Sequence, residues 1–261
     1  MNALTRYLVI AVAAMTISWL ASPSLARAQG EALKTPKRAA APAATPRTAD
    51  GKVDFSGIWT PDRKFIYDIN DALKKGETLP IQEWALKVTL ERLSKDDPEA
   101  LCLPAGVPRQ APYPWRILQT PTHMFFLFEG NIHSYRQIFM NGKHPDAADL
   151  DPTWYGHSIG RFEGDTLVID TIGFNDKFWF DFAGHPHTEK LHVTERWRLI
   201  ENGAKIEVLL TIDDPDTFNA PFKALRQYDR VNRTFEEDRC SKNNSINLFD
   251  YDTPTAETPD F

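Results

Sequence analysis

The sequence predicts a single all-β domain that closes into a barrel and carries one helix and long N-terminal loops. The first observation is about ten short strand-like runs with short turns between them, most of them after residue 115. The second is that apolar and polar side chains alternate in these runs, so that each strand would bury one face. The third is that one stretch has helical spacing, while no internal repeat marks a second domain. Tandem strands of this kind close into a barrel or a sandwich.

The first 28 residues are predicted to be a secretory signal peptide. A positive start at Arg6 precedes an almost wholly apolar run over residues 7–20, and Ala26-Arg27-Ala28 is a small-x-small cleavage site. We therefore expect cleavage after Ala28 and a periplasmic or secreted protein. The predicted segments are a signal peptide over 1–28, a disordered linker over 29–52, a β-barrel domain over 53–242 and a C-terminal tail over 243–261.

The charge of the chain limits its partners. Cleavage after Ala28 would leave 28 basic and 36 acidic side chains, which is a formal charge of −8 with neutral histidines. An acidic protein without a basic stripe is a poor partner for nucleic acid or for an anionic membrane surface. We expect a small-molecule ligand or substrate instead, and the sequence does not indicate the oligomeric state.

Two cysteines, Cys102 and Cys240, lie far apart in the sequence. In an oxidising compartment such a pair usually forms one disulfide, which would stabilise the fold by roughly 4–5 kcal/mol through loop closure. The alternative is two free buried thiols. A metal site built on these cysteines is disfavoured, because the sequence has no CxxC motif.

The helix is predicted over Pro80–Ser94, after a first strand near Phe55–Thr60. Proline suits a first helical turn, and apolar residues recur at helical spacing behind it. Two hairpins are marked by the turns Glu163-Gly164-Asp165 and Asn202-Gly203-Ala204. The later strands are predicted at Trp115–Thr120, His123–Glu129, Ser134–Met140, His157–Phe162, Thr166–Ile172, Leu191–Ile200, Lys205–Ile212, Phe222–Arg230 and Thr234–Cys240.

Two resemblances refine this fold. Gly57-Ile58-Trp59 in the first strand resembles the G-x-W signature of lipocalins and the wider calycin group, which implies a calycin-like antiparallel barrel around a cavity. A second set of motifs spans most of residues 53–242 and comprises Ser56-Gly57-Ile58-Trp59, Cys102-Leu103-Pro104, Gln119-Thr120-Pro121, Arg136-Gln137-Ile138-Phe139, the stretch 156–176, Gly184-His185-Pro186-His187 and Val193-Thr194-Glu195-Arg196. With these motifs the chain resembles a large group of uncharacterised secreted bacterial proteins, which implies export and a β-rich domain but no particular reaction.

A charged side chain on an inward face is the first candidate for chemistry. In the strand Leu191–Ile200, Glu195 shares a face with Val193 and Trp197, and the strand pattern places that face in the core. Arg136 also lies among apolar neighbours. Because a buried carboxylate needs a partner, we hypothesise that Arg136 and Glu195 pair inside the barrel. The pair is either a structural salt bridge or a polar cavity floor where Glu195 moves protons and Arg136 holds a developing negative charge.

His157 is the second candidate. It opens a strand within Gly156-His157-Ser158-Ile159-Gly160, where small neighbours leave room for a ligand. As a functional residue it would be a proton shuttle or a polar anchor, and otherwise it is a hydrogen-bonded histidine at the barrel rim. The predicted catalytic residues are therefore His157, Glu195 and Arg136.

A group of histidines follows the predicted strand Thr166–Ile172. His185 and His187 are two residues apart, and His192 lies shortly after them. Such side chains are suitable ligands for zinc, iron or manganese, so the three histidines are the predicted site of a divalent metal. The alternatives are a structural or ligand-contacting loop and no cofactor.

Aromatic side chains crowd the segment between Phe174 and Phe182. Packed inward they would form a lid over the barrel mouth, and exposed they would form a patch for a partner. Aromatic lids suit sugars or flat apolar molecules. The predicted substrate-binding residues are Tyr155, Asn175, Asp176, Trp179, Asp181 and Trp197.

The sequence lacks a P-loop, a dinucleotide-binding fingerprint and a CxxCH haem-attachment motif. We expect an exported enzyme that uses acid/base chemistry, with or without a metal. It would be a lyase, isomerase or hydrolase acting on a small cyclic, aromatic or sugar substrate. The alternatives are a periplasmic binding protein for a small apolar ligand and a structural protein with a filled barrel.

Overall fold

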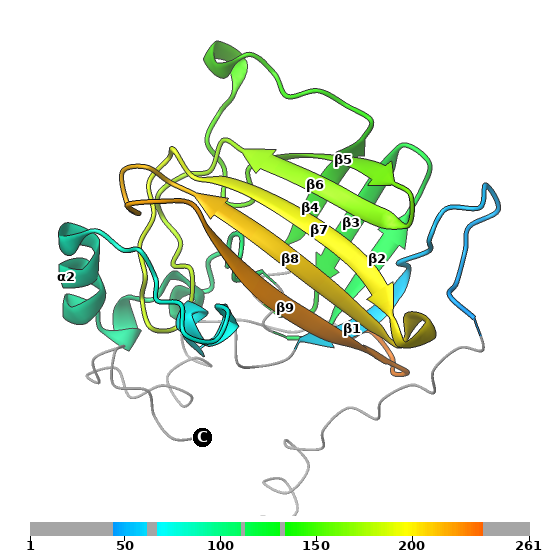
Figure 1. The fold of residues 1–261 in the computed structure, drawn as a ribbon, viewed down its shortest axis with the longest axis horizontal. Coiled ribbons are helices and arrows are strands. Elements are labelled where there is room, and N and C mark those ends of the chain that lie inside the picture. Colours follow the sequence, from blue (N-terminus) through cyan, green and yellow to red (C-terminus); the bar gives the residue numbers. More distant parts are fainter. Residues whose placement is uncertain (1–43, 62–66, 111–112, 131–133, 237–261) are drawn as a thin grey trace, which may run out of the picture. The chain divides into compact units, whose positions relative to one another are not determined.

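The computed structural model describes residues 44–61, 67–110, 113–130 and 134–236. Nine strands form a closed barrel in which sequence neighbours pair and the last strand pairs with the first (Figure 1). This all-β barrel is the fold that the sequence predicts. The strands are β1 (Gly57–Pro61), β2 (Trp115–Gln119), β3 (His123–Phe128), β4 (Tyr135–Met140), β5 (His157–Glu163), β6 (Thr166–Ile172), β7 (His192–Ile200), β8 (Lys205–Asp213) and β9 (Phe222–Val231).

One pair of strands departs from the antiparallel arrangement that the sequence predicts. β4 and β5 are parallel, with Ile138 opposite Ser158, whereas the other eight pairs are antiparallel. Parallel neighbours need a long crossover connection, and residues 141–156 supply it together with the short helix η4 (Ala147–Asp149). The likeness to calycins remains a prediction.

Both predicted hairpin turns are confirmed. Gly164, with φ of 60°, lies in the turn between β5 and β6, where the left-handed backbone favours glycine. The short helix η5 (Glu201–Gly203) joins β7 to β8. The last predicted strand, Thr234–Cys240, is not formed over residues 234–236, and its other residues lie outside the described part of the chain.

The predicted helix is shorter than the sequence pattern indicates. α2 spans Glu83–Glu91, while the preceding Gln82 is extended. Ile81 forms an isolated bridge with Phe218, which holds the residues before the helix in an extended backbone. The other helical elements are the 3-10 helices η1 (Ile69–Ala72), η2 (Ser94–Asp96) and η3 (Pro98–Leu101).

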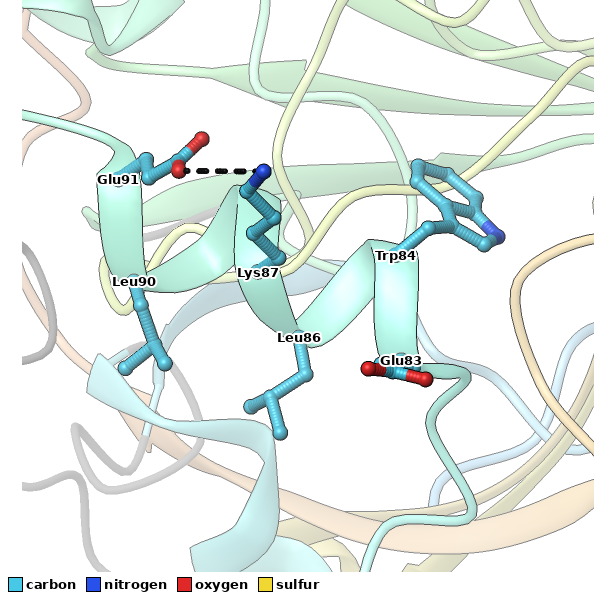
Figure 2. Close-up of a pocket in the computed structure, with 6 residues that line it drawn as sticks. All are labelled: Glu83, Trp84, Leu86, Lys87, Leu90 and Glu91. Carbon is cyan, nitrogen blue, oxygen red and sulfur yellow. Dashed lines mark ion pairs between the residues drawn. The ribbon is translucent and has the colours of Figure 1, made fainter.

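One side of α2 packs on the protein and the other faces outward. Ala85 and Thr89 are buried, whereas Leu86 and Leu90 are 44% and 58% exposed. Figure 2 shows these leucines projecting from the helix, away from the ion pair between Lys87 and Glu91. Within the described residues, no helix has the length and apolar character that crossing a membrane requires.

Residues 44–52 do not match the disordered linker predicted over 29–52. Arg47 forms an isolated bridge with Val53, and its guanidinium lies 2.8 Å from the carboxylate of Asp165 in the β5–β6 turn. These contacts attach the segment to the barrel wall. The predicted signal peptide, the remainder of the linker, the tail over 243–261 and Cys240 lie outside the described residues, so the disulfide with Cys102 stays a prediction.

Aromatic side chains pack in the barrel interior. The ring of Trp115 lies 5.0 Å from those of Phe126 and Tyr228 and 5.9 Å from that of Trp197. All four side chains are at most 1% exposed. Edge-to-face aromatic packing of this kind adds to the stabilisation from burial. The polar residues of the interior therefore lie beside a dense apolar core.

Candidate functional site

A buried ion pair lies beside this aromatic core. Glu195 on β7 and Arg136 on β4 are each 1% exposed, and Arg136 Nη2 lies 2.6 Å from Glu195 Oε2. Val193 and Trp197, which share a face with Glu195, are fully buried. The inward orientation and the pairing that the sequence predicts are both confirmed.

Three neutral side chains complete the network around the ion pair. Arg136 donates from Nε to Ser158 Oγ at 3.0 Å, from Nη1 to Gln110 Oε1 at 3.0 Å and from Nη2 to Thr171 Oγ1 at 2.8 Å. Gln110 in turn donates from Nε2 to Glu195 Oε1 at 3.2 Å. These bonds join β4, β5, β6 and β7 to the segment before β2. Because both charged groups are satisfied within the protein, the geometry favours a structural salt bridge over an open acid/base site.

His157 points to the opposite side of the barrel wall. Neighbouring side chains alternate along a strand, and Ser158 faces the interior network, so His157 faces outward. Phe139 of β4 stacks on the imidazole at 5.0 Å with an angle of 11° between the rings. The predicted catalytic residues His157, Glu195 and Arg136 therefore do not form one site. Alternation along a strand shows which residues of that strand share a face. It does not show that His157 lies on the opposite side of the wall from Arg136 and Glu195, which belong to other strands.

His157 belongs to a chain of hydrogen bonds on the outer face of the barrel. Its Nδ1 lies 2.9 Å from His144 Nδ1, and His144 Nε2 lies 3.0 Å from Asp170 Oδ2. Asp170 Oδ1 lies 2.8 Å from His192 Nε2 and 3.1 Å from Thr194 Oγ1. The adjacent strands β5, β6 and β7 bring these side chains together, and the crossover after β4 supplies His144. We call these five residues the outer-face relay.

The charge of Asp170 sets the proton positions in the outer-face relay. Burial works against ionisation, but hydrogen bonds from His192 and His144 lower the pKa of Asp170 to about 2. An ionised carboxylate only accepts hydrogen bonds, so His144 carries a proton on Nε2 and, when neutral, a lone pair on Nδ1. His157 must then donate from its Nδ1. The lone pair of the neutral His157 ring is therefore on Nε2.

Two histidines of the relay have opposite pKa shifts. Burial and the neighbouring His144 lower the pKa of His157 below its ordinary value of 6.5. The hydrogen bond to Asp170 raises the pKa of His192, although burial opposes it. The lowered pKa leaves the His157 ring neutral at neutral pH, so that it can accept a proton.

A groove of about 650 Å³ lies beside His157 on the outer face. Its volume falls within the range of roughly 300–1,000 Å³ that is typical of small-molecule sites. The buried Tyr155 lines the groove, and its hydroxyl is 2.7 Å from Ser134 Oγ. The aromatic and acidic side chains that line the groove are Tyr135, Phe139, Trp154, Tyr155, Asp149 and Asp151.

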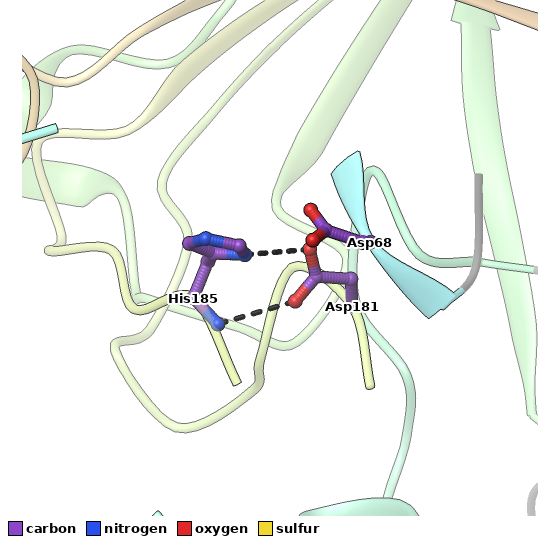
Figure 3. A group of neighbouring side chains, drawn as sticks. All are labelled: Asp68, Asp181 and His185. Atoms are coloured by element: carbon purple, nitrogen blue, oxygen red, sulfur yellow. Dashed lines mark hydrogen bonds and ion pairs between the residues drawn. The ribbon is translucent and has the colours of Figure 1, made fainter. Parts of the chain in front are cut away.

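A second histidine group lies in the loop after β6. The buried Asp181 accepts hydrogen bonds at Oδ2 from Ile69 N and His185 Nδ1, both at 2.7 Å. Its Oδ1 accepts from Gly184 N at 3.0 Å and from His185 N at 3.2 Å. Figure 3 shows the His185 ring and backbone nitrogen both directed at this carboxylate, with Asp68 beside it. Asp181 thus attaches the loop to the start of η1.

This loop and the residue before η1 together form the one group in the described part of the chain with metal-ligand spacing. Potential ligand atoms of Asp68, Asp181 and His185 lie within 4.8 Å of one another. However, each oxygen of Asp181 already accepts two hydrogen bonds, and Asp68 Oδ1 accepts two from Asn70. These donors satisfy both oxygens of Asp181 and one oxygen of Asp68 without a cation. The group is therefore explained as a structural anchor of the loop.

The three histidines predicted to bind a metal do not converge. His185 belongs to the loop anchor and His192 to the outer-face relay, while His187 Nδ1 lies 3.1 Å from Thr188 O. Burial lowers the pKa of His187 to about 4, so this side chain is neutral in its apolar surroundings. The residues from 183 to 189 form no strand, so the two-residue alternation assumed for His185 and His187 does not apply.

Of the six predicted substrate-binding residues, five lie away from the groove. Tyr155 lines the groove. Trp197 packs in the barrel interior, and Trp179 lies under the guanidinium of Arg92 at 4.7 Å. The aromatic segment is packed inward, because Phe174, Phe178 and Phe180 are fully buried. The predicted residues that do not line the groove are Asn175, Asp176, Trp179, Asp181 and Trp197.

Sequence reasoning missed several members of both networks. Asp170 is opposite Thr194 in the β6–β7 pairing, so the polar positions of these strands could have indicated it. His144 and Gln110 lie outside the strands, and no sequence spacing places them. Ser158 carries a further signal, because Gly156–Gly160 has the G-x-S-x-G pattern of a nucleophile elbow. That motif needs an exposed serine at a strand-to-helix turn, whereas Ser158 is a fully buried residue within β5.

Comparisons of the chain with protein-family models, curated proteins and solved structures find no match.

We expect the interior ion pair to show strong energetic coupling. Arg136→Met or Glu195→Leu alone leaves one charge buried and should lower the free energy of unfolding by about 3–5 kcal/mol. The double variant should lose clearly less than the sum, because it removes both charges. Urea unfolding of the four proteins measures the coupling. The cross-strand pair Arg198 and Glu207, in which Arg198 is exposed and Glu207 partly buried, is the control and should couple by less than about 1 kcal/mol. Additive losses at Arg136 and Glu195 would contradict the structural assignment.

The loop anchor should make stability depend on pH. Burial opposes it, but Asp181 raises the pKa of His185 above 6.5 in the folded state. The resulting stabilisation is complete below the unfolded-state pKa and is lost as pH rises through the higher folded-state value. Chemical unfolding across mildly acidic to mildly alkaline pH should show a smaller decline for His185→Asn than for the wild type. The control is His123→Asn, at a ring that contacts Thr122 and phenylalanines instead of a carboxylate. If the stability of His185→Asn declines with rising pH as steeply as that of the wild type, the pairing of His185 with Asp181 does not contribute the proposed stabilisation.

Proposed function

We propose that the protein is an enzyme that transfers a proton to or from a small molecule in the groove beside His157. The observation that carries the proposal is the direction of the outer-face relay, which leaves the lone pair of neutral His157 on Nε2. Reactions of this class include those of lyases, isomerases and hydrolases. The proposal includes export to the periplasm or the medium, which rests on the sequence pattern of residues 1–28.

The relay supports each stage of a proton transfer. When His157 Nε2 accepts a proton, the ring becomes cationic and its Nδ1–H bond to His144 strengthens. His144 passes this polarisation to the ionised Asp170 through its own Nε2–H. Asp170 is held in place by His192 and Thr194, so the carboxylate need not reorient as charge develops. The stacked Phe139 fixes the plane of the His157 ring.

Arg136 and Glu195 act in this proposal as positioning residues. Their network holds Ser158 on β5 and Thr171 on β6, next in sequence to His157 and Asp170. Loss of the network would shift the strands that carry the relay. Neither charged group is expected to touch the substrate.

The second candidate function is a binding protein for a small apolar ligand. The aromatic lining of the groove, which includes Tyr135, Phe139 and Trp154, supports it. In that case, a ligand would occupy the same groove and leave unchanged.

Base-catalysed ring opening of 5-nitrobenzisoxazole tests for a general base in the groove. Wild-type protein should exceed the buffer rate, and the rate should rise with pH through a midpoint below 6.5, because the active form of His157 is the deprotonated one. His157→Gln should lose about 100-fold or more of the enzymatic rate. Its melting temperature should change little, because the ring is only partly buried.

Two further variants make this test specific. Asp170→Asn should also lower the rate, because an amide no longer fixes the tautomer of His144. Arg198→Gln alters an exposed side chain of β7 that belongs to neither the relay nor the groove, and it should keep the wild-type rate. Catalysis that survives in His157→Gln would refute the assignment of the base. Binding to the groove without turnover in wild-type protein would favour the binding protein instead.

A further inference from the structure

We infer that the groove beside His157 recognises a small organic cation with an apolar body. This inference names the ligand class of the proposed site, and it rests on the proposed function only for the choice of groove. Its basis is the described lining of the groove, which combines carboxylates and aromatic rings with a guanidinium that is buried and therefore not accessible to a ligand.

The carboxylates come from the crossover between β4 and β5. Asp149, at the end of η4, and Asp151 line the groove and are exposed to solvent. Asp146 lies in the same crossover, but it does not line the groove. A cation placed in the groove would therefore approach two carboxylates at once, which adds attraction even in water.

Aromatic rings supply the second element. Tyr135, Phe139, Trp154 and Tyr155 lie along the groove. The faces of such rings attract alkylammonium groups through their quadrupole and also cover the attached carbon skeleton. The combination of rings and carboxylates is suited to a cationic head with an apolar body.

The third element is that the positive charge of the lining is buried. Arg136 is the one lysine or arginine among the described lining residues, and its side chain has no exposed surface. Its guanidinium faces the barrel interior and is paired with Glu195. His157 is neutral at neutral pH because its pKa is lowered. An anionic ligand would thus find no accessible cation among the described lining residues, and the net charge of −6 for the chain also favours cations.

The ligand class is tested with two probes of nearly the same shape. Choline carries a quaternary ammonium group, and 3,3-dimethylbutanol replaces it by a neutral tert-butyl group. Titrations followed by tryptophan fluorescence and by calorimetry should show at least tenfold tighter binding of choline to the full-length protein. Raising the salt concentration from about 0.05 to 0.5 M should weaken choline binding and leave the neutral probe unchanged.

Variants of the crossover identify the carboxylates responsible. Asp149→Asn and Asp151→Asn should each weaken choline binding by about fivefold, as expected for one nearby charge in water. Asp146→Asn is the matched control in the same crossover and should change binding by less than twofold. Because these side chains are exposed, all three variants should fold normally, which circular dichroism verifies.

The outcomes separate this inference from the proposed function. Equal affinity for both probes, or equal weakening by Asp146→Asn and Asp149→Asn, would overturn the inference. Charge-selective binding that depends on Asp149 and Asp151 would support it even if 5-nitrobenzisoxazole is not turned over, and only the proton-transfer proposal would then fail. Turnover of 5-nitrobenzisoxazole without any preference for choline would support the proton-transfer proposal and overturn the inference about the ligand class.

Discussion

The ion pair between Arg136 and Glu195 is the interaction on which the rest of the structure depends. Burying two charges is unfavourable unless every donor and acceptor finds a partner, and here Gln110, Ser158 and Thr171 provide them. Together with Arg136 and Glu195, these partners come from four strands and one loop. The network can therefore be complete only when β4 to β7 are in register, and this requirement makes the pair a constraint on the arrangement of the wall.

That constraint extends through the wall to its outer face. Ser158 and Thr171 lie opposite each other in the β5–β6 ladder. In each strand, the preceding residue points to the outer face. His157 precedes Ser158, and Asp170 precedes Thr171. A one-residue slip would exchange the two faces, because side chains alternate with a period of two. The interior network and the outer-face relay are thus two consequences of one strand register.

The parallel pairing of β4 and β5 gives the outer face its groove. An antiparallel hairpin could join these strands by a tight turn, but a parallel pair needs the crossover of residues 141–156. This segment contributes His144 to the relay, and it contributes Asp149 and Asp151 to the groove. The departure from a simple meander therefore supplies both a proton-transfer partner and acidic lining to the same place.

The local sequence pattern is sufficient to predict much of the fold. Alternation and turn chemistry predict nearly all of the strands, and they predict that Glu195 points inward and needs a partner such as Arg136. The helix that the pattern predicts begins too early, because a bridge between Ile81 and Phe218 overrides helical propensity before Glu83. Sequence spacing also grouped His185, His187 and His192, because it treated an irregular loop as if it were a strand.

The sequence by itself determined which residues lie inside each strand, since a period of two and the need to satisfy buried charge are local properties. Only the tertiary structure decided which residues meet. It placed His157 and Glu195 on opposite sides of one wall, and it joined His144 to Asp170 across 26 positions of the chain. These contacts depend on strand register and on the path of a crossover, and neither is encoded in the spacing of neighbouring residues.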